Sequence, residues 1–353
     1  MTTDLTQDLQ QRIVQAASTG EPVEILGGGS KRFYGRAPSG TLLEVGGHRG
    51  IVNYEPVELV VSARAGTPLR QLEQTLFEQN QMLAFEPPHF ADTTTLGGAI
   101  AAGLSGPRRM TSGAARDFVL GCTLINGKGE LLRFGGEVMK NVAGYDVSRL
   151  MTGACGTLAV LLDISLKVLP RPESEMTLVF ELDTAEAIRQ ANRWAAQPLP
   201  VTATCHHNGQ LYLRLSGATK AVTAAAKQMG GEQHADMSEL WSGLRDQTHS
   251  FFADAQTLWR LSVPPASGPL LSGGEWLYEW CGAQRWLKTD ATAEQIRAAA
   301  ARAGGHATMF RTPQREGDVF HPLPAKIMSV HQALKRAFDP RQIFNPGRMY
   351  AEL

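Results

Sequence analysis

Apolar residues recur at helical spacing at the start of the chain and in short strand-like runs after it. Leu5, Leu9 and Ile13 predict an amphipathic helix, which Gly20-Glu21-Pro22 ends. Thr67 and Pro68 have the chemistry of an N-cap and a first helical residue, so a second helix is expected there. Between the two helices, short strands are predicted at residues 23–26, 42–44, 51–54 and 59–63. The chain is therefore expected to open with a small α/β unit.

Strand patterns continue towards the middle of the chain and then stop at a proline pair. Strands are predicted at residues 117–126 and 131–134, joined by the turn dipeptides Asn126-Gly127 and Lys128-Gly129. The alternating run 164–168 is followed by Pro170-Arg171-Pro172, which breaks the pattern. A domain boundary is expected at that break.

Strand and helix patterns alternate beyond the break, which predicts an antiparallel α+β layer. The expected strands are 176–182, 201–206, 210–215, 256–262 and 276–281, and the expected helices are 184–196 and 217–229. Thr292 with Gln295 resembles a capping box, and a last helix carries Ile327, Val330 and Leu334 on one face. The final residues contain too many turn-forming and ring-bearing side chains for a frayed tail, and we expect them to dock on the body.

Composition adds limits on size, partners and location. A chain of 353 residues exceeds one ordinary core, so two domains are expected. Lys plus Arg and Asp plus Glu are both 34, with no long run of one sign, which argues against a nucleic-acid partner. The N-terminus has no basic segment followed by an apolar one, and no apolar run approaches the ~20 residues of a spanning helix. We expect a cytoplasmic chain that does not span a membrane.

The four cysteines, at positions 122, 155, 205 and 281, stand far apart and form no C-x-x-C pair. Their spacing suits neither a zinc site nor an iron–sulfur cluster. Isolated cysteines in a cytoplasmic protein are usually small buried hydrophobes, so reduced thiols are expected.

The first glycine-rich loop, Gly27-Gly28-Gly29-Ser30, follows a predicted strand. Glycines let successive N–H groups converge on an anion, which makes the loop a candidate phosphate site. Alone it is equally compatible with a structural turn, and it fits neither the G-x-G-x-x-G nor the P-loop pattern. Three further glycine-rich segments, at 93–98, 113–117 and 153–158, strengthen the interpretation. Four such loops favour one extended ligand.

The order of these motifs resembles the FAD domain of the vanillyl-alcohol oxidase superfamily. The segments that carry the resemblance are Gly27 to Ser30, Thr95 to Gly98 with Asp117 and Leu120-Gly121, Gly144-Tyr145-Asp146, Gly153 to Leu158, and Phe338 to Gly347. The stretches Glu86-Pro87-Pro88-His89, Gly106 to Arg109, Arg133 to Asp146 and Asn345 to Tyr350 are similar to the FAD-binding subunit of bacterial glycolate oxidase. The likeness is dense in the N-terminal half, returns at Trp280 to Lys288, and is thin between them.

This resemblance implies an α+β fold with a two-part PCMH-type FAD-binding domain and a smaller antiparallel cap. The implied limits are 1–171 for the FAD domain, 172–338 for the cap, and 339–353 for a tail that docks on the FAD site. Non-covalent FAD is expected, because Ser30 and Lys31 stand where covalent relatives place a flavin-linking histidine. The implied cofactor contacts are Gly27, Gly28, Gly29, Ser30, Lys31, Pro88, Thr94, Thr95, Leu96, Gly97, Gly98, Ser112, Asp117, Gly153, Gly156, Thr157, Leu158 and Asn345.

Oxidation of a 2-hydroxy acid needs a cation for the carboxylate and a base for the hydroxyl proton. The candidate cations are Arg108, Arg109, Arg260 and Arg285, and the candidate bases are His306 and His331. Arg285, Arg260 and His306 are taken as the catalytic candidates, although each alone is more typical of a structural or surface residue. Metal-dependent relatives carry a His-rich Gly-Asp-Gly-Asn stretch, where this chain has Gly304-Gly305-His306-Ala307-Thr308, so no metal site is predicted.

Three functions fit these features. The first is the FAD-binding subunit of a glycolate oxidase complex, which works with a catalytic FAD- and metal-dependent subunit and an iron–sulfur subunit. It would act on glycolate or D-lactate, in the cytoplasm or at the cytoplasmic face of the inner membrane through the complex. The second is a self-sufficient FAD oxidase or dehydrogenase of a small alcohol or hydroxy acid. The third is a non-catalytic subunit that keeps its flavin for stability.

Overall fold

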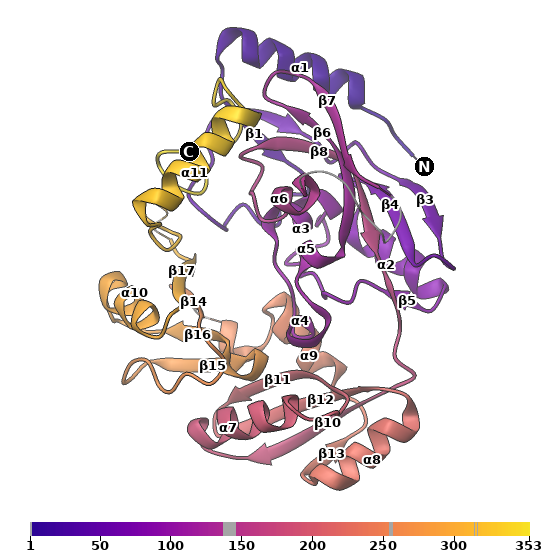
Figure 1. Ribbon diagram of the computed structural model, residues 1–353, viewed down its shortest axis with the longest axis vertical. Coiled ribbons are helices and arrows are strands. Elements are labelled where there is room, and N and C mark those ends of the chain that lie inside the picture. The colour runs from indigo at the N-terminus through magenta and orange to yellow at the C-terminus, as the bar shows by residue number, and fades with distance from the viewer. Residues whose placement is uncertain (1, 137–145, 254–256, 314, 316) are drawn as a thin grey trace. The chain divides into compact units, whose positions relative to one another are not determined.

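The computed structural model describes residues 2–136, 146–253, 257–313, 315 and 317–353. Residues 137–145, which carry Gly144-Tyr145 and most of the Arg133 to Asp146 stretch, lie outside the described residues. The chain forms two compact units. Figure 1 colours the chain from indigo at the N-terminus to yellow at the C-terminus. The first contains residues 1–104, 114–170 and 315–353, and the second contains residues 105–113 and 171–314.

The first unit contains a five-stranded antiparallel sheet in the order β3-β4-β8-β6-β7, a parallel pair β1-β2 and a short pair β5-β9. Its strands are β1 (Val23–Leu26), β2 (Thr41–Glu44), β3 (Ile51–Glu55), β4 (Val60–Arg64), β5 (Gln81–Met82), β6 (Val119–Asn126), β7 (Leu131–Gly135), β8 (Ala159–Lys167) and β9 (Leu169–Pro170). Its helices are α1 (Thr6–Thr19), α2 (Leu69–Glu78), α3 (Leu96–Ala102), α5 (Ala115–Phe118), α6 (Val147–Met151) and α11 (Ala325–Phe338).

Helices and sheet of the first unit share one apolar core. Leu9 and Ile13 of α1 are fully buried in it, as the helical spacing predicted. Alternate residues of β8, including Leu162 and Ile164, enter the same core because successive side chains of a strand point to opposite faces. Phe344, near the C-terminus, is also in this core and bridges Val23 of β1 in parallel. The end of the chain thus extends the β1-β2 pair.

The second unit contains an eight-stranded antiparallel sheet in the order β13-β10-β12-β11-β15-β16-β14-β17. Its strands are β10 (Ser174–Glu181), β11 (Val201–His207), β12 (Gln210–Gly217), β13 (Glu232–His234), β14 (Leu258–Ser262), β15 (Glu275–Glu279), β16 (Gln284–Lys288) and β17 (His306–Arg311). Its helices are α4 (Arg109–Ser112), α7 (Thr184–Ala195), α8 (Thr219–Met229), α9 (Ser238–Asp246), α10 (Ala293–Arg302) and the short 3₁₀ helices η1 (Ser250–Phe252) and η2 (Trp280–Gly282).

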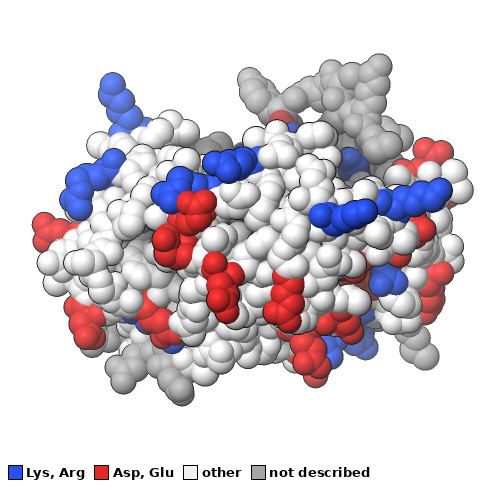
Figure 2. Space-filling model, turned by 90° about the horizontal axis from the view of Figure 1, so that it is seen from below, with Lys and Arg blue, Asp and Glu red and all other residues white. Residues whose placement is uncertain are grey.

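Helices cover one face of each half of this sheet. Helices α7 and α8 pack on Leu211, Leu213 and Leu215 of β12, and α10 packs on Trp259 and Leu261 of β14 (Figure 1). The charges on the molecular face drawn in Figure 2 have both signs, in keeping with the equal numbers of acidic and basic residues. Within the residues that the structure describes, no helix is long and apolar enough to cross a membrane.

Most predicted elements are present, with local corrections. The capping box of Thr292 and Gln295 is confirmed at the start of α10. Thr67 was wrongly predicted as an N-cap: its hydroxyl bonds the backbone of Gly50, and α2 begins after Pro68. The predicted strand 117–126 begins with the helical turn α5, and the predicted strand 276–281 ends in η2.

The two compact units depart from the expected domain limits in two places. Residues 105–113 lie in the second unit, where Trp280 Nε1 donates to the Gly106 carbonyl over 3.2 Å. Residues 315–338 lie in the first unit, because the buried Lys335 of α11 bonds the Thr157 carbonyl over 2.7 Å. No sequence pattern indicated that residues 105–113 belong to the second unit or that residues 315–338 belong to the first.

Candidate functional site

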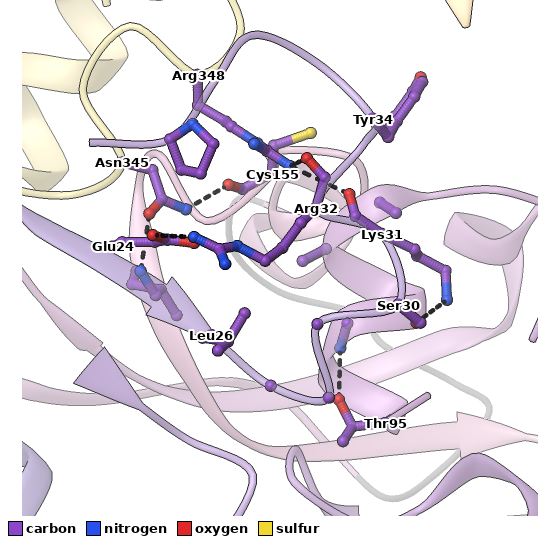
Figure 3. Close-up of a pocket in the computed structure, with 18 residues that line it drawn as sticks. Glu24, Leu26, Ser30, Lys31, Arg32, Tyr34, Thr95, Cys155, Asn345 and Arg348 are labelled. Atoms are coloured by element: carbon purple, nitrogen blue, oxygen red, sulfur yellow. Dashed lines mark hydrogen bonds and ion pairs between the residues drawn. The ribbon is translucent and has the colours of Figure 1, made fainter. Parts of the chain in front are cut away.

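A pocket in the first unit opens where β1 ends and the first glycine-rich loop begins (Figure 3). It shares part of its lining with a second pocket; the two hold about 620 and 570 Å³ of space, which includes open solvent. The residues that line both pockets are Ile25, Gly27, Thr95, Gly98, Ala101, Cys155 and Asn345.

Three glycines that line the two pockets are required by the close approach of neighbouring atoms. A Cβ on Gly28 would lie 1.4 Å from the Thr93 carbonyl oxygen, and a Cβ on Gly27 would lie 2.5 Å from Thr95 Oγ1. A Cβ on Gly97 would lie 2.7 Å from that of Ala65. The first and second glycine-rich loops therefore pack directly on each other, and no larger residue fits between them.

The first loop presents backbone N–H groups that could hold an anion. Among the described residues, none accepts a hydrogen bond from the N–H of Gly28, Gly29 or Ser30. Gly29 has a φ of 73°, the left-handed conformation that turns successive N–H groups to one side. Thr94 Oγ1 lies 2.8 Å from Ser30 Oγ, and this hydrogen bond connects the first loop to the second. This arrangement suits a phosphate group.

The C-terminal tail closes one side of the pocket, as Figure 3 shows for Asn345 and Arg348. Asn345 Oδ1 accepts from the Ile25 N–H over 2.8 Å, and its Nδ2 donates to the Cys155 carbonyl over 2.7 Å. A Cβ on Gly156 would lie 2.6 Å from Asn345 Nδ2. One buried asparagine thus joins β1 to the fourth glycine-rich loop.

Charged side chains gather at the tail side of the first pocket. Glu24 pairs with Arg32 over 2.8 Å, and the buried Arg348 donates to three backbone carbonyls. Lys31 Nζ lies 5.4 Å from the centroid of the Phe90 ring. Burial raises the pKa of the Cys155 thiol to about 11, so this pocket residue is a neutral thiol at physiological pH.

The structure brings ten of the predicted cofactor contacts to the two pockets. They are Gly27, Gly28, Gly29, Ser30, Lys31, Thr95, Gly97, Gly98, Gly156 and Asn345. Sequence reasoning missed the neighbouring side chains of Glu24, Arg32, Cys155 and Arg348. Arg348 stands in the Asn345-Pro346-Gly347-Arg348 motif, which was a usable signal, whereas Glu24 and Arg32 have no motif of their own.

Other predicted contacts do not line these two pockets, and several have structural roles instead. Leu96 and Leu158 belong to the apolar core, and Pro88 is buried. The Asp117 carboxylate accepts from the Ala114 N–H over 2.9 Å, and the Gly153 N–H donates to the Ile100 carbonyl. Thr157 Oγ1 donates to the Ala154 carbonyl, and Ser112, in the second unit, donates to the Arg108 carbonyl.

The three catalytic candidates lie in the second unit on different faces of its sheet. Arg285 pairs with Leu261, on the face that α10 covers, and its fully buried guanidinium donates to the carbonyls of Gly282, Gly268 and Ser267. Three of its five N–H donors are thus bonded to the backbone, which favours a structural role over the predicted contact with substrate. Arg260 lies on the opposite face, paired with Thr308, and His306 pairs with Ser262 on that same face.

The remaining sequence candidates are held by neighbours in their own units. Arg108 pairs with Glu175 of β10, and the guanidinium of Arg109 lies 4.5 Å from the Trp280 ring centroid. His331 of α11 makes an edge contact with Tyr350. In the described part of the chain, no group of three His, Cys, Asp or Glu residues is placed to hold a metal ion.

The comparisons with known proteins decide the family. The FAD binding domain family matches residues 3–135, which include the first three glycine-rich segments. Glycolate oxidase subunit GlcE of Escherichia coli (strain K12) is 49% identical over 351 residues, which cover 99% of each chain. The chain belongs to the GlcE family. Its cofactor is FAD.

More distant relatives of this GlcE family member share part of the chain or its fold. Glycolate oxidase subunit GlcD of Bacillus subtilis (strain 168) is 34% identical over 117 residues, 33% of this chain and 25% of its own. A structure of alkyldihydroxyacetonephosphate synthase superposes with a TM-score of 0.67 over 96% of this chain and 74% of its own, at 14% identity. That likeness confirms the predicted α+β fold of an FAD domain with an antiparallel cap.

Proposed function

We propose that this chain is the FAD-binding subunit of a glycolate oxidase complex. The complex oxidises glycolate, and also D-lactate, to the 2-oxo acid and passes the electrons to an iron–sulfur subunit. The observation that carries the proposal is the full-length match to a protein named as a subunit of glycolate oxidase. The pocket supports it, because its free N–H groups, glycines and adjoining apolar space suit a dinucleotide.

Each part of the pocket has a role in this proposal. The Gly27–Ser30 loop binds the diphosphate of non-covalently held FAD, with Lys31 beside it as a cation. Thr95, Gly97, Gly98 and Gly156 line the adenosine or ring system, and Asn345 fixes the tail against them. When bound, FAD supplies a two-electron acceptor for the hydride that leaves C2 of the hydroxy acid.

The residues proposed to bind the substrate belong to the second unit. Arg260 would pair with the substrate carboxylate, and His306, on the neighbouring strand and the same sheet face, would take the hydroxyl proton. The side chain of His306 is exposed, which leaves it accessible to a small acid. Arg285 takes no part, since its donors hold the backbone.

The proposed partners are a second flavoprotein subunit, which carries a metal-dependent glycolate site, and the iron–sulfur subunit. We propose that the complex lies at the cytoplasmic face of the inner membrane, where the iron–sulfur subunit can pass its electrons to an acceptor. The name of the Escherichia coli relative supports an assembly of several subunits.

The test is anaerobic reduction of the flavin with and without the partner subunits. The chain is purified alone and in its native complex, and glycolate or D-lactate is added while the flavin absorbance is followed. We expect bleaching only in the complex. Bleaching of the isolated chain would instead indicate a self-sufficient oxidoreductase, and a flavin that stays oxidised while the complex turns over would indicate a non-catalytic role.

A further inference from the structure

Two arginines from the C-terminal end of the sequence converge on the segment that follows the phosphate loop. Arg348 donates to the Arg36 carbonyl over 2.8 Å and to the Lys31 and Arg32 carbonyls over 3.1 Å each. Arg315 donates to the Gly35 carbonyl over 3.0 and 3.1 Å and to the Arg36 carbonyl over 2.9 Å. Both guanidiniums therefore donate hydrogen bonds to backbone carbonyls within residues 31–36.

The bonds of Arg348 join the two ends of that stretch. Lys31 and Arg32 begin it directly after Ser30, and Arg36 ends it. The Arg36 N–H also donates to the Arg348 carbonyl over 2.9 Å, so the tail holds the segment from backbone and side chain at once. A guanidinium is suited to this task because its planar fork presents several donors in fixed directions.

The surroundings of these arginines are also electropositive. Arg348 is buried, and burial lowers its pKa, while burial and the neighbouring Arg348 and Arg32 lower that of Arg315 to about 10. Glu24 is the carboxylate that interacts with both of them. Neutral carbonyls do not cancel the positive charge of the guanidiniums, so this charge still attracts a nearby anion.

We propose that Arg348 and Arg315 are positioning residues that fix the Lys31–Arg36 segment and thereby hold the Gly27–Ser30 loop in its anion-binding conformation. The proposal rests on the proposed function in one respect: the diphosphate of FAD binds at that loop. Neither arginine is assigned a contact with the flavin ring. Their removal therefore weakens binding of the diphosphate part of the cofactor and leaves binding of the ring part unchanged.

The experiment measures the dissociation constants of FAD, ADP and riboflavin for the full chain, by flavin fluorescence and by ADP competition. Arg348→Met is expected to weaken FAD and ADP binding by about 10- to 100-fold, the range for losing hydrogen bonds from a charged group. Riboflavin, which lacks the diphosphate, is expected to change by less than about threefold. Arg315→Met should show the same selectivity with a smaller effect, because it shares the Arg36 acceptor.

Two further variants separate positioning from charge and from folding. Arg341→Met removes an exposed arginine of the same tail and is expected to leave all three constants unchanged. Arg348→Lys keeps the charge but replaces the planar fork, whose two terminal nitrogens divide between the Arg36 carbonyl and the Lys31 and Arg32 carbonyls, by a single nitrogen. It should therefore weaken FAD binding nearly as much as methionine does. Wild-type FAD affinity in Arg348→Lys, or equal losses for FAD and riboflavin in both methionine variants, overturns the proposal. If the wild-type chain binds no FAD, the proposed function fails instead.

Discussion

The two units build their polar sites in different ways. In the first unit, the pocket is made largely of backbone and small residues, and segments more than 300 residues apart in sequence meet in it, as the bond from Ile25 to Asn345 shows. In the second unit, the candidate side chains follow a regular antiparallel sheet, where strand register decides which of them share a face. A motif therefore identifies the first kind of site, whereas only the register identifies the second.

This difference explains the outcome for the arginines. Arg260 and Arg285 were both candidates in sequence, and Arg285 was favoured by its neighbours Trp280 and Trp286. The register places their side chains on opposite faces of the sheet. Arg285 lies on the face that α10 covers, where its guanidinium bonds backbone carbonyls such as that of Gly268. The following changes test how far the contrast between the units extends, from the largest expected effect to the smallest.

Lys335→Met should cause the largest loss of stability, and it tests the assignment of α11 to the first unit. Lys335 Nζ lies 2.9 Å from Asp339 Oδ2, and both side chains are buried. Removing one partner of a buried ion pair costs about 3–5 kcal/mol, because the other charge remains without compensation. Chemical denaturation should show this loss, whereas Lys326→Met, on the exposed face of the same helix, should change stability by less than about 0.5 kcal/mol. Equal effects of the two variants would contradict the docking.

Gly28→Ala should come next and tests whether the backbone forms the cofactor site. The added Cβ must displace the Thr93 carbonyl, and forced repacking of this kind costs about 1–3 kcal/mol. FAD binding should weaken by up to about 100-fold in a fluorescence titration. Gly268→Ala is the matched control in the second unit, because nothing lies within 4 Å of its Cβ position. Unchanged affinity in Gly28→Ala would refute the role of the loop.

The comparison also shows what the sequence could predict. The glycine loops and Asn345 were found because close backbone approach and tail docking leave residue types that recur in a fixed order. The crossings at 105–113 and 315–338 were missed because long-range contacts, such as that of Lys335 with Thr157, leave no local pattern. Thr67 was misread because its hydroxyl bonds Gly50, 17 residues away, rather than the helix that follows it.

Arg260→Met and Arg285→Met should have opposite consequences in the second unit. Arg260→Met should leave stability within about 1 kcal/mol and reduce glycolate turnover by the complex roughly 10-fold or more, through loss of a charged carboxylate contact. Arg285→Met should lower stability by about 1–3 kcal/mol, because buried carbonyls lose their donors. Thermal unfolding and steady-state rates separate the two. A turnover defect in a fully stable Arg285→Met would restore it as a substrate residue.

The smallest effect concerns the thiol in the first pocket. With its pKa raised from 9.0 to about 11, Cys155 should react with a thiol reagent at pH 8 about 100-fold more slowly than a free thiol, and more slowly still with FAD bound. Its contribution to stability is present below pH 9 and is lost as the pH rises towards 11, since the unfolded thiol ionises first. Mass spectrometry of the labelled peptide would follow the reaction, and rapid labelling that FAD does not slow would place Cys155 outside the site.

The most direct test of the account is a titration of the purified chain with FAD, followed by acid precipitation. We expect saturable binding of one FAD per chain, release of all the flavin into the acid supernatant, and weaker binding in Gly28→Ala but not in Gly268→Ala. Failure to bind FAD, or equal binding by wild type and Gly28→Ala, would contradict the central claim that the first unit holds the flavin through its glycine-rich loops.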